Sequence, residues 1–165
     1  MRTIELLDKH HDRDSFDCDN EALNQFLKQT VRQHIQKGIS RTFVLIDTEQ
    51  PKIIIGFFTL TLCEVRVEKL PLQFSKKYPS NVPAVKLARL AVSKICQRQG
   101  IGGVLIIEAM QRALIVAENA GGIGIFVDAK NEAARAYYER YGFVHLEDAS
   151  LELFLPLSTI QQMLE

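Results

Sequence analysis

Residues 89–105 read RLAVSKICQRQGIGGVL, and this stretch is the most informative part of the chain. An apolar run that ends at Val92 predicts a strand, and the apolar pattern after Gly103 predicts a long helix. Three glycines, at positions 100, 102 and 103, lie between them. Because glycine costs chain entropy, such a loop indicates that a ligand approaches the backbone closely. N–H groups at a helix start lack helical partners, so the expected ligand is a phosphate.

We expect this loop to bind a pyrophosphate through Gln97, Arg98, Gln99, Gly100, Ile101, Gly102 and Gly103. No Gly-Lys-Ser/Thr follows it, which excludes the phosphate-binding loop of NTPases. Leu105 stands where a dinucleotide fingerprint needs its third glycine, which excludes that motif as well. A glycine-rich turn without any ligand stays open as the alternative.

The first half of the chain predicts a helix followed by a β-hairpin. Apolar residues recur at helical spacing over residues 20–37, with Asp19 as the expected N-cap and Gly38 after the last turn. Two β-rich runs, at 41–48 and 52–67, are separated by a turn and therefore predict a hairpin.

The second half alternates strands with helices. After a loop or short helix at 70–84, the pattern predicts strands at 85–93, 123–129, 143–148 and 150–157, a helix from the glycine loop to Gly121, a short helix at 132–141 capped by Asn131, and one or two helical turns at the end. Such alternation around a mixed sheet defines an α/β or α+β class with a three-layer sandwich. The length of 165 residues suits one domain over 1–165.

Composition and charge restrict the class of protein. Lys plus Arg is 20 and Asp plus Glu is 20, a net charge of zero that argues against a protein coating nucleic acid non-specifically. Three cysteines without metal-like spacing indicate a reducing cytoplasm. We expect no metal, because His10, His11 and His34 are scattered and are interpreted as surface histidines. We expect no membrane span, because the apolar runs are too short.

Two motifs resemble the GNAT superfamily of N-acetyltransferases. The first is Q-x-x-G-x-G after Leu90-Ala91-Val92, which is similar to motif A of the superfamily. The second starts at Asn131, reads N-x-x-A-x-x-[FY]-Y-x-x-x-G-F and ends at Phe143. The resemblance implies a three-layer sandwich in which helices flank a mixed, mostly antiparallel central sheet. It also implies acetyl-CoA as the co-substrate.

The resemblance assigns roles to particular residues. The pyrophosphate of acetyl-CoA would lie against the loop from Gln97 to Gly103. Backbone N–H groups of Leu90, Ala91 and Val92 would hold the carbonyl oxygen or the pantetheine amides. Asn131 is expected among the cofactor-binding residues. Tyr138 occupies the position of the catalytic tyrosine, so we expect it to protonate the leaving thiolate.

A narrower likeness is to GNAT toxins whose antitoxin carries a ribbon–helix–helix DNA-binding domain. It rests on F-D-C-x-N-x-x-L-N-x-F-L from Phe16, L-x-R-L-A-V from Leu87 and F-V-D-A-K from Phe126. Because members acetylate the α-amine of aminoacyl-tRNA, the likeness implies that substrate, such an antitoxin and a homodimer. One departure lies in the loop. The branch often has Q-G-R-G where this chain has QRQG at 97–100.

The sequence supplies no evident general base. Glu64 and Glu68 lie near a strand end, but exposed carboxylates are the more common interpretation. An α-amine has a pKa near ~8, against ~10.4 for a lysine side chain, so an α-amine substrate needs little help to lose its proton. Arg32 and Arg89 are candidates to contact an anionic acceptor, and Arg89 could equally pair with a carboxylate.

Two other functions stay open at this stage. One is a GNAT enzyme that acetylates a protein N-terminus, a lysine or a small amine. The other is a non-catalytic module that binds CoA or an antitoxin. Retention of Tyr138 together with an intact glycine loop argues against the module.

Overall fold

Seven strands form the sheet of this protein, whose computed structural model describes residues 1–165. They are β1 (Arg2–Leu6), β2 (Arg41–Asp47), β3 (Gly56–Val65), β4 (Val82–Val92), β5 (Gly124–Asp128), β6 (Val144–His145) and β7 (Glu152–Pro156). Their order is β1-β2-β3-β4-β5-β7-β6. Strand β4 pairs with β5 in parallel, whereas β1–β2, β2–β3, β5–β7 and β6–β7 are antiparallel. The predicted mixed, mostly antiparallel sheet is confirmed.

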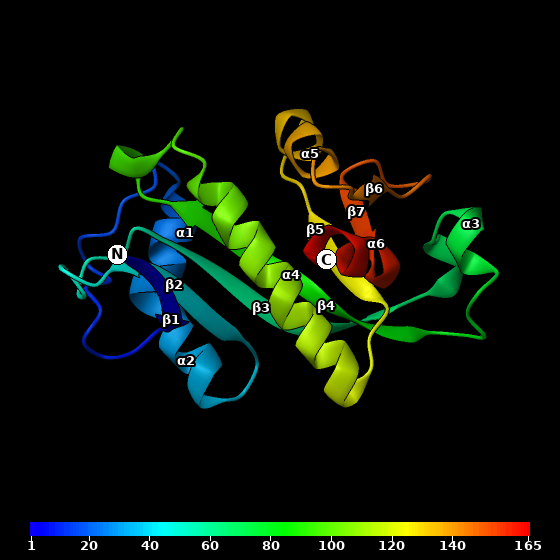
Figure 1. Cartoon of the computed structure of the whole chain (residues 1–165), viewed down its shortest axis with the longest axis horizontal. Helices are drawn as coiled ribbons and strands as arrows, with labels where there is room; N and C mark the ends of the chain where they lie inside the picture. Colours follow the sequence, from blue (N-terminus) through cyan, green and yellow to red (C-terminus); the bar gives the residue numbers. More distant parts are fainter. The chain divides into compact units, whose positions relative to one another are not determined.

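Helices or helical turns follow β1, β3, β4, β5 and β7 along the chain (Figure 1). They are α1 (Glu21–Gln25), the π-helix η1 (Phe26–Thr30), α2 (Val31–Gln36), α3 (Leu72–Ser75), α4 (Ile101–Ala120), α5 (Glu132–Glu139) and α6 (Leu157–Leu164), with 3₁₀ turns η2 (Val67–Lys69) and η3 (Lys94–Cys96). None of them combines the length and the apolar character needed to cross a bilayer. The backbone divides into two compact units, Met1–Thr61 with Ala88–Ala109 and Leu62–Leu87 with Met110–Glu165. That the chain is one domain stays a prediction.

In the first unit, β2 and β3 form the predicted hairpin. Strand β2 pairs with β3 from Arg41 opposite Leu60 to Leu45 opposite Gly56, which confirms the hairpin. Strand β1 then pairs with the outer edge of β2. The sequence pattern does not predict β1. Its burial runs exposed, intermediate and exposed again, so it lacks the alternation that reveals a half-buried strand.

The predicted helix over 20–37 exists, but it is not one regular α-helix. A π-helical turn, η1, separates α1 from α2. The N-cap is Asn20, whose side chain accepts the N–H of Leu23 at 3.1 Å, so the prediction of Asp19 as the cap is wrong by one residue. The end is as predicted. Gly38 adopts φ +71 and closes the helix with N–H bonds from Gly38 and Ile39 to earlier carbonyls.

Helices cover both faces of the sheet in the first unit. One buried cluster joins η1 and α2 to the strands: Phe26, Leu27, Val31, Val44, Ile46 and Phe57. Side chains alternate along a strand, so Gly56 faces the other side, towards α4. A Cβ added to Gly56 would lie 3.0 Å from the carbonyl oxygen of Ala91 and 3.1 Å from a methyl group of Leu105. The glycine therefore allows close packing.

The second unit has its own core around the strand pair β5–β7. The ring of Phe154 stacks on Phe126 at 4.8 Å and meets Phe74 edge-on at 5.4 Å. Phe74 belongs to α3, the short helix expected within 70–84. Strands β6 and β7 pair as predicted, and α6 supplies the expected C-terminal turns.

Two glycines with positive φ allow a test of steric fit. Gly124 has φ +149, and a Cβ added there would lie 2.1 Å from the carbonyl oxygen of Leu155. Gly121 has φ +93, but nothing lies within 4 Å of its Cβ position. We expect Gly124→Ala to lower the free energy of unfolding by about 3 kcal/mol or more, and Gly121→Ala by only about 1 kcal/mol. Urea denaturation measures both, and equal losses would contradict the steric explanation.

Candidate functional site

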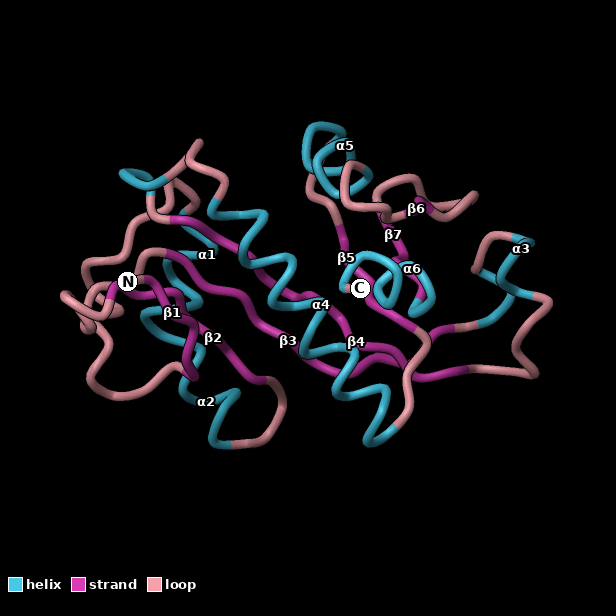
Figure 2. The backbone as a smooth tube through the Cα atoms, viewed as in Figure 1, coloured by secondary structure: helices cyan, strands magenta, loops and turns pink.

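The connection between β4 and α4 has the form that the sequence predicts. Figure 2 traces it as a loop with one short helical turn, η3, before α4 begins at Ile101. Gly100 is exposed and adopts φ +78, a conformation that favours glycine. The backbone N–H groups of Ile101, Gly102 and Gly103 open the helix, where no helical carbonyl stands four residues earlier. They can therefore donate to an anion.

A side-chain amide holds this loop. Nε2 of Gln97 donates to the carbonyl oxygens of Val92, at 3.0 Å, and Cys18, at 3.1 Å. The backbone N–H of Lys94 donates to the carbonyl of Asp17 at 2.9 Å, and Nζ of Lys94 lies 3.2 Å from the Asp17 carboxylate. The segment before the glycine turn is thus tied to residues 17 and 18. The sequence predicts only a ligand contact for Gln97, because its partner Cys18 is 79 residues away in the chain.

Asp17 and Cys18, the partners of Lys94 and Gln97, belong to the F-D-C-x-N segment, and further hydrogen bonds hold them in place. Asn24 is buried, its Oδ1 accepts the N–H of Cys18 at 3.0 Å, and its Nδ2 donates to Asp17 at 3.0 Å. The N–H of Asp19, the Asn24 amide and Lys94 together lower the pKa of Asp17 to about 2. The carboxylate is therefore charged at neutral pH. Hydrogen bonds and an ion pair thus join five residues: Asp17, Cys18, Asn24, Lys94 and Gln97.

Arg98 has an unusual backbone. Its φ is +65, a left-handed conformation that costs a non-glycine residue roughly 1–2 kcal/mol. This is the position where the toxin branch often has glycine, so the departure in the loop changes the backbone energy as well as the side chain. The side chain is exposed and has no carboxylate partner, which leaves its charge available to a ligand.

The end of β4 carries the other expected backbone contacts. Strand β4 pairs with β5 over Val85–Leu87 and continues through Leu90, Ala91 and Val92. The guanidinium of Arg89 lies 3.7 Å from the centre of the Phe26 ring, and burial lowers the pKa of Arg89. The sequence offered an anion or a carboxylate as its partner. The structure shows instead an aromatic ring, a cation–π contact that fixes the side chain.

Helix α5 positions the candidate catalytic tyrosine. Asn131 is its N-cap, as predicted, because its Oδ1 accepts the N–H of Ala134 at 2.9 Å. The ring of Tyr138 meets that of Phe143 edge-on at 5.4 Å. Burial raises the pKa of Tyr138 to about 12, so the phenol carries its proton at neutral pH. It can donate a hydrogen bond to a developing negative charge.

Four further titratable side chains of the second unit fit structural roles. Tyr137 and Tyr141 meet edge-on at 5.5 Å, in agreement with packed aromatics, and burial raises the pKa of Tyr137. Glu64 and Glu68 are exposed, as the more common interpretation of such carboxylates predicts. Both acids are therefore assigned to the exposed surface.

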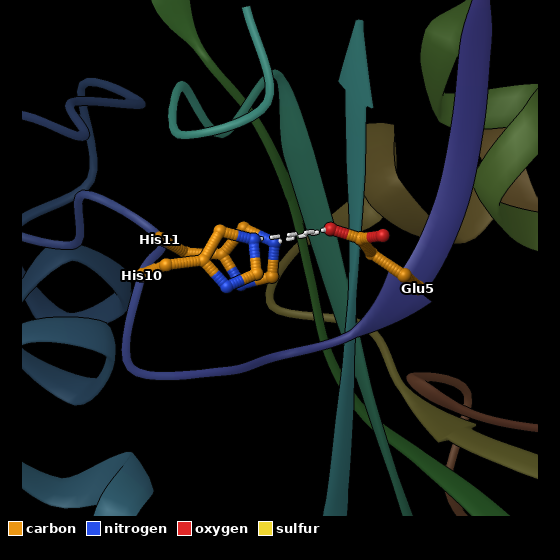
Figure 3. Close-up of side chains that lie close together, drawn as sticks. All are labelled: Glu5, His10 and His11. Carbon is orange, nitrogen blue, oxygen red and sulfur yellow. Dashed lines mark hydrogen bonds and ion pairs between the residues drawn. The ribbon is translucent and has the colours of Figure 1, made fainter. Parts of the chain in front are cut away.

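Two histidines gather where the sequence suggested scattered surface residues (Figure 3). That interpretation is wrong for His11, which is only 4% exposed. Ligand atoms of Glu5, His10 and His11 lie within 4.8 Å of one another, whereas His34 lies apart on α2. However, Nδ1 of His11 accepts the N–H of Asp8 at 2.9 Å, so the proton resides on Nε2, 2.7 Å from Glu5. This tautomer leaves Nε2 no lone pair for a metal.

A comparison of the whole chain with known families identifies its class. The acetyltransferase (GNAT) domain matches residues 14–153, which include the glycine loop and α5. The chain belongs to the GNAT acetyltransferase family, and the predicted N-acetyltransferase is confirmed at that level.

Two relatives are toxins, which confirms the likeness to GNAT toxins. The chain is 32% identical to a tRNA-acetylating toxin of Mycobacterium tuberculosis over 78% of this chain and 76% of that toxin. It is 27% identical to the protein named "probable toxin TacT" of Sinorhizobium fredii over 99% of this chain and 95% of the relative.

Solved structures agree with the predicted fold. AtaT complexed with acetyl-methionyl-tRNAfMet superposes with a TM-score of 0.91 at 35% identity, covering 100% of both chains. AtaTR bound with acetyl-CoA gives a TM-score of 0.85 at 36% identity, covering 99% of this chain and 98% of that one. An AtaT tyrosine-to-phenylalanine variant bound to the C-terminus of its antitoxin AtaR gives 0.83 at 32% identity, covering 98% and 97%.

The backbone of Arg98 yields a prediction about stability. Arg98→Gly removes left-handed strain of roughly 1–2 kcal/mol but adds roughly 0.4–1 kcal/mol of unfolded-state entropy, so we expect a gain in stability between zero and about 1.6 kcal/mol. The neighbouring Gln99 is equally exposed but does not have a positive φ, so Gln99→Gly should lose about 0.5–1 kcal/mol. Chemical denaturation distinguishes them, and a loss in both variants would contradict the strain at Arg98.

Proposed function

We propose that this protein transfers the acetyl group of acetyl-CoA to the α-amine of aminoacyl-tRNA, as the toxin of a toxin–antitoxin pair. The observation that carries the proposal is the anchored glycine loop at the start of α4, in a chain of the GNAT family. The M. tuberculosis relative is a tRNA-acetylating toxin, and AtaT has been solved with an acetylated aminoacyl-tRNA. These relatives support the choice of acceptor.

Acetyl-CoA fits the groups that the loop offers. Its pyrophosphate would accept hydrogen bonds from the N–H groups of residues 100–103, and Arg98 would add a positive charge. Gln97 would act by holding the loop, since its amide already has two carbonyl partners. Gln99 is exposed and can reach the ligand from the same turn. Leu90, Ala91 and Val92 would supply backbone donors to the thioester or pantetheine part.

The pKa of Tyr138 decides how it would act. An ordinary thiol has a pKa near 8.5, so full proton transfer from a phenol with a pKa of about 12 to the thiolate is unfavourable by roughly three to four powers of ten. We therefore propose that Tyr138 donates a hydrogen bond to the sulfur as the C–S bond breaks. This hydrogen bond stabilises the negative charge that develops on sulfur in the transition state, and stabilisation of the transition state is what raises the rate.

The acceptor amine would lose its proton to solvent. Neither exposed acid, Glu64 or Glu68, is suited as a base. At pH 7.5 roughly a quarter of an α-amine with a pKa near 8 is neutral, but only about a thousandth of a lysine amine. An α-amine therefore suits this protein better than a lysine side chain.

The RNA would be held by local cations, because the net charge is zero. Two basic side chains are already paired, Lys86 with Asp128 at 2.8 Å and Lys94 with Asp17. Lys28, Arg32 and Arg98 have no carboxylate partner, so we propose these for phosphate contacts. Arg89 would contribute through the guanidinium edge that Phe26 leaves uncovered. We further propose an antitoxin as partner, because AtaT has been solved with its antitoxin AtaR. A ribbon–helix–helix type for that antitoxin, a homodimer and a cytoplasmic location are proposed from the likeness in sequence alone.

The role of Tyr138 predicts a specific kinetic loss. Tyr138→Phe keeps the ring contact with Phe143 but removes the donor, so we expect turnover to fall by about 10²-fold with acetyl-CoA affinity unchanged. Because the proton is lost only near pH 12, the wild-type rate should rise with pH through the pKa of the amine and show no fall from Tyr138 below about pH 10. Stopped-flow rates and calorimetry measure these quantities. Wild-type turnover in the variant would assign Tyr138 to packing alone.

The acceptor is tested with radiolabelled acetyl-CoA. We expect acetyl incorporation into bulk charged tRNA, but not into deacylated tRNA, N-terminal peptides or lysine. If about three phosphates are contacted, raising salt from about 50 to 200 mM should lower the rate on tRNA on the order of 10–100-fold and affect acetyl-CoA affinity much less. Gly102→Glu, which places a carboxylate at the pyrophosphate, is the inactive control. If peptides or small amines are acetylated efficiently and charged tRNA is not, aminoacyl-tRNA is refuted as the acceptor, but the acetyltransferase activity is not.

A further inference from the structure

Asn24 is a buried amide that has no part in the reaction proposed above. It lies in α1, and its residue is only 5% exposed. A polar side chain in such a place costs free energy unless it is hydrogen-bonded, and an aliphatic side chain would avoid that cost. The amide therefore points to a requirement at the atoms that it binds.

Both ends of this amide bind the segment before α1. Its Oδ1 accepts the backbone N–H of Cys18 at 3.0 Å and lies 3.2 Å from the Cys18 sulfur, which can donate its S–H. Its Nδ2 donates to Oδ1 of Asp17 at 3.0 Å. The chain turns at the next residue, since Asp19 has φ +65, a left-handed conformation that is uncommon outside glycine. Asn24 therefore fixes a turn that the local backbone does not favour.

This turn presents two backbone carbonyls to the segment before α4. The Asp17 carbonyl accepts the N–H of Lys94 at 2.9 Å, and the Cys18 carbonyl accepts Nε2 of Gln97 at 3.1 Å. Helix α4 begins at Ile101, so only residues 98–100 separate the Gln97 anchor from the helix. Asn24 thus acts on the glycine loop through one carbonyl and one side-chain amide.

A short anchored loop is prepared for an anion before the anion arrives. Two of its residues, Arg98 and Gly100, have left-handed backbones with φ +65 and φ +78. A free loop would lose conformational entropy when it brings its N–H groups to one ligand, and an ordered loop has lost that entropy already. Loss of the anchor should therefore weaken binding of an anion at the loop. It should leave the chemistry at a distant thioester much less affected.

We propose that Asn24 is a positioning residue for acetyl-CoA. Through the Cys18 carbonyl and the Gln97 amide, it holds the glycine loop in the conformation that binds the pyrophosphate. It acts through these residues and not by contact with the cofactor. This inference rests on the proposed function, because the pyrophosphate is that of the proposed co-substrate.

The first test compares two acetyl donors, with the full chain and charged tRNA as the acceptor. S-acetylpantetheine has the thioester of acetyl-CoA but lacks its pyrophosphate. We expect Asn24→Leu to raise the KM for acetyl-CoA about 10–100-fold, with kcat changed less than about threefold. With S-acetylpantetheine, kcat/KM should change less than about threefold, because this donor offers the loop no pyrophosphate. Equal losses with both donors would reveal general damage and overturn the proposal.

Two further measurements do not depend on activity. Calorimetry with free CoA should show the same rise in Kd, about 10–100-fold in Asn24→Leu. In the ligand-free chain, the N–H groups of Lys94 and Cys96 donate to the carbonyls of Asp17 and Ser93. Their hydrogen exchange should become at least about tenfold faster in Asn24→Leu, whereas exchange in β5 and β7 should stay the same. Unchanged exchange at Lys94, or faster exchange throughout the chain, would contradict a local anchor.

Gln25→Ala is the matched control variant. Gln25 follows Asn24 in α1, but its Nε2 donates to Glu21 of the same helix at 2.7 Å. Its loss should change the Kd of CoA less than about threefold, and a loss equal to that of Asn24→Leu would refute the specific role of Asn24. Asn24→Asp is the second variant if circular dichroism shows that Asn24→Leu is unfolded. It keeps an acceptor for Cys18 but turns a carboxylate towards Asp17, so it should weaken CoA binding as well.

The path through Gln97 is tested with Gln97→Met, which keeps the length of the side chain but removes its amide. If Asn24 acts through Gln97, the double variant should bind CoA little more weakly than the weaker single variant. Losses that multiply would overturn the path. A wild-type chain that binds no CoA refutes the proposed function and this inference together. If the wild type binds CoA and acetylates charged tRNA while Asn24→Leu binds CoA equally well, only this inference fails.

Discussion

The buried amide of Asn24 is the group on which the candidate site depends. One end accepts the N–H of Cys18 and the other donates to Asp17, so the start of α1 and the chain before it have a fixed shape. That shape presents the carbonyls of residues 17 and 18 to Lys94 and Gln97. A buried donor left without a partner costs about 1–3 kcal/mol. The position of the loop before α4 is thus fixed by contacts with a segment some 70 or more residues earlier in the chain.

This arrangement gives the F-D-C-x-N segment a physical meaning. In the sequence it is only a mark of likeness to one group of acetyltransferases. In the structure this segment fixes the loop through the ion pair of Asp17 with Lys94. Because the pKa of Asp17 is about 2, the carboxylate stays ionised from neutral pH down to about 2. The stability that it contributes is therefore present above the usual pKa of an aspartate and is lost only as the pH falls towards about 2.

Local signals made much of the fold predictable. The hairpin, the helix opened by glycines and the Asn131 cap follow from alternation, spacing and turn chemistry over a few residues. Strand β1 was missed because it lies at the sheet edge and lacks a buried face. The second role of Gln97 depends on Cys18, which is 79 residues away in the chain. The π-turn and the burial of His11 depend on bonds to nearby residues, but alternation and helical spacing do not encode these bonds. Asp19 and Asn20 are both good caps, and only the backbone separates them, since Asp19 has φ +65.

The π-turn also sets the phase of the helix that follows it. Each residue of an α-helix advances by about 100°, so one extra residue in a turn rotates everything after it by that angle. Phe26 and Leu27, at the start of the π-turn, belong to the core cluster, whereas Arg32 and Ile35 after it lie beside the turn that follows β1, where Ile35 also packs against that cluster. A chain shortened by one residue at this point would keep the helix and its core contacts at one end. Gln33 and Gln36 would then take the places of Arg32 and Ile35. The length of this turn therefore decides which side chains the helix presents at that surface.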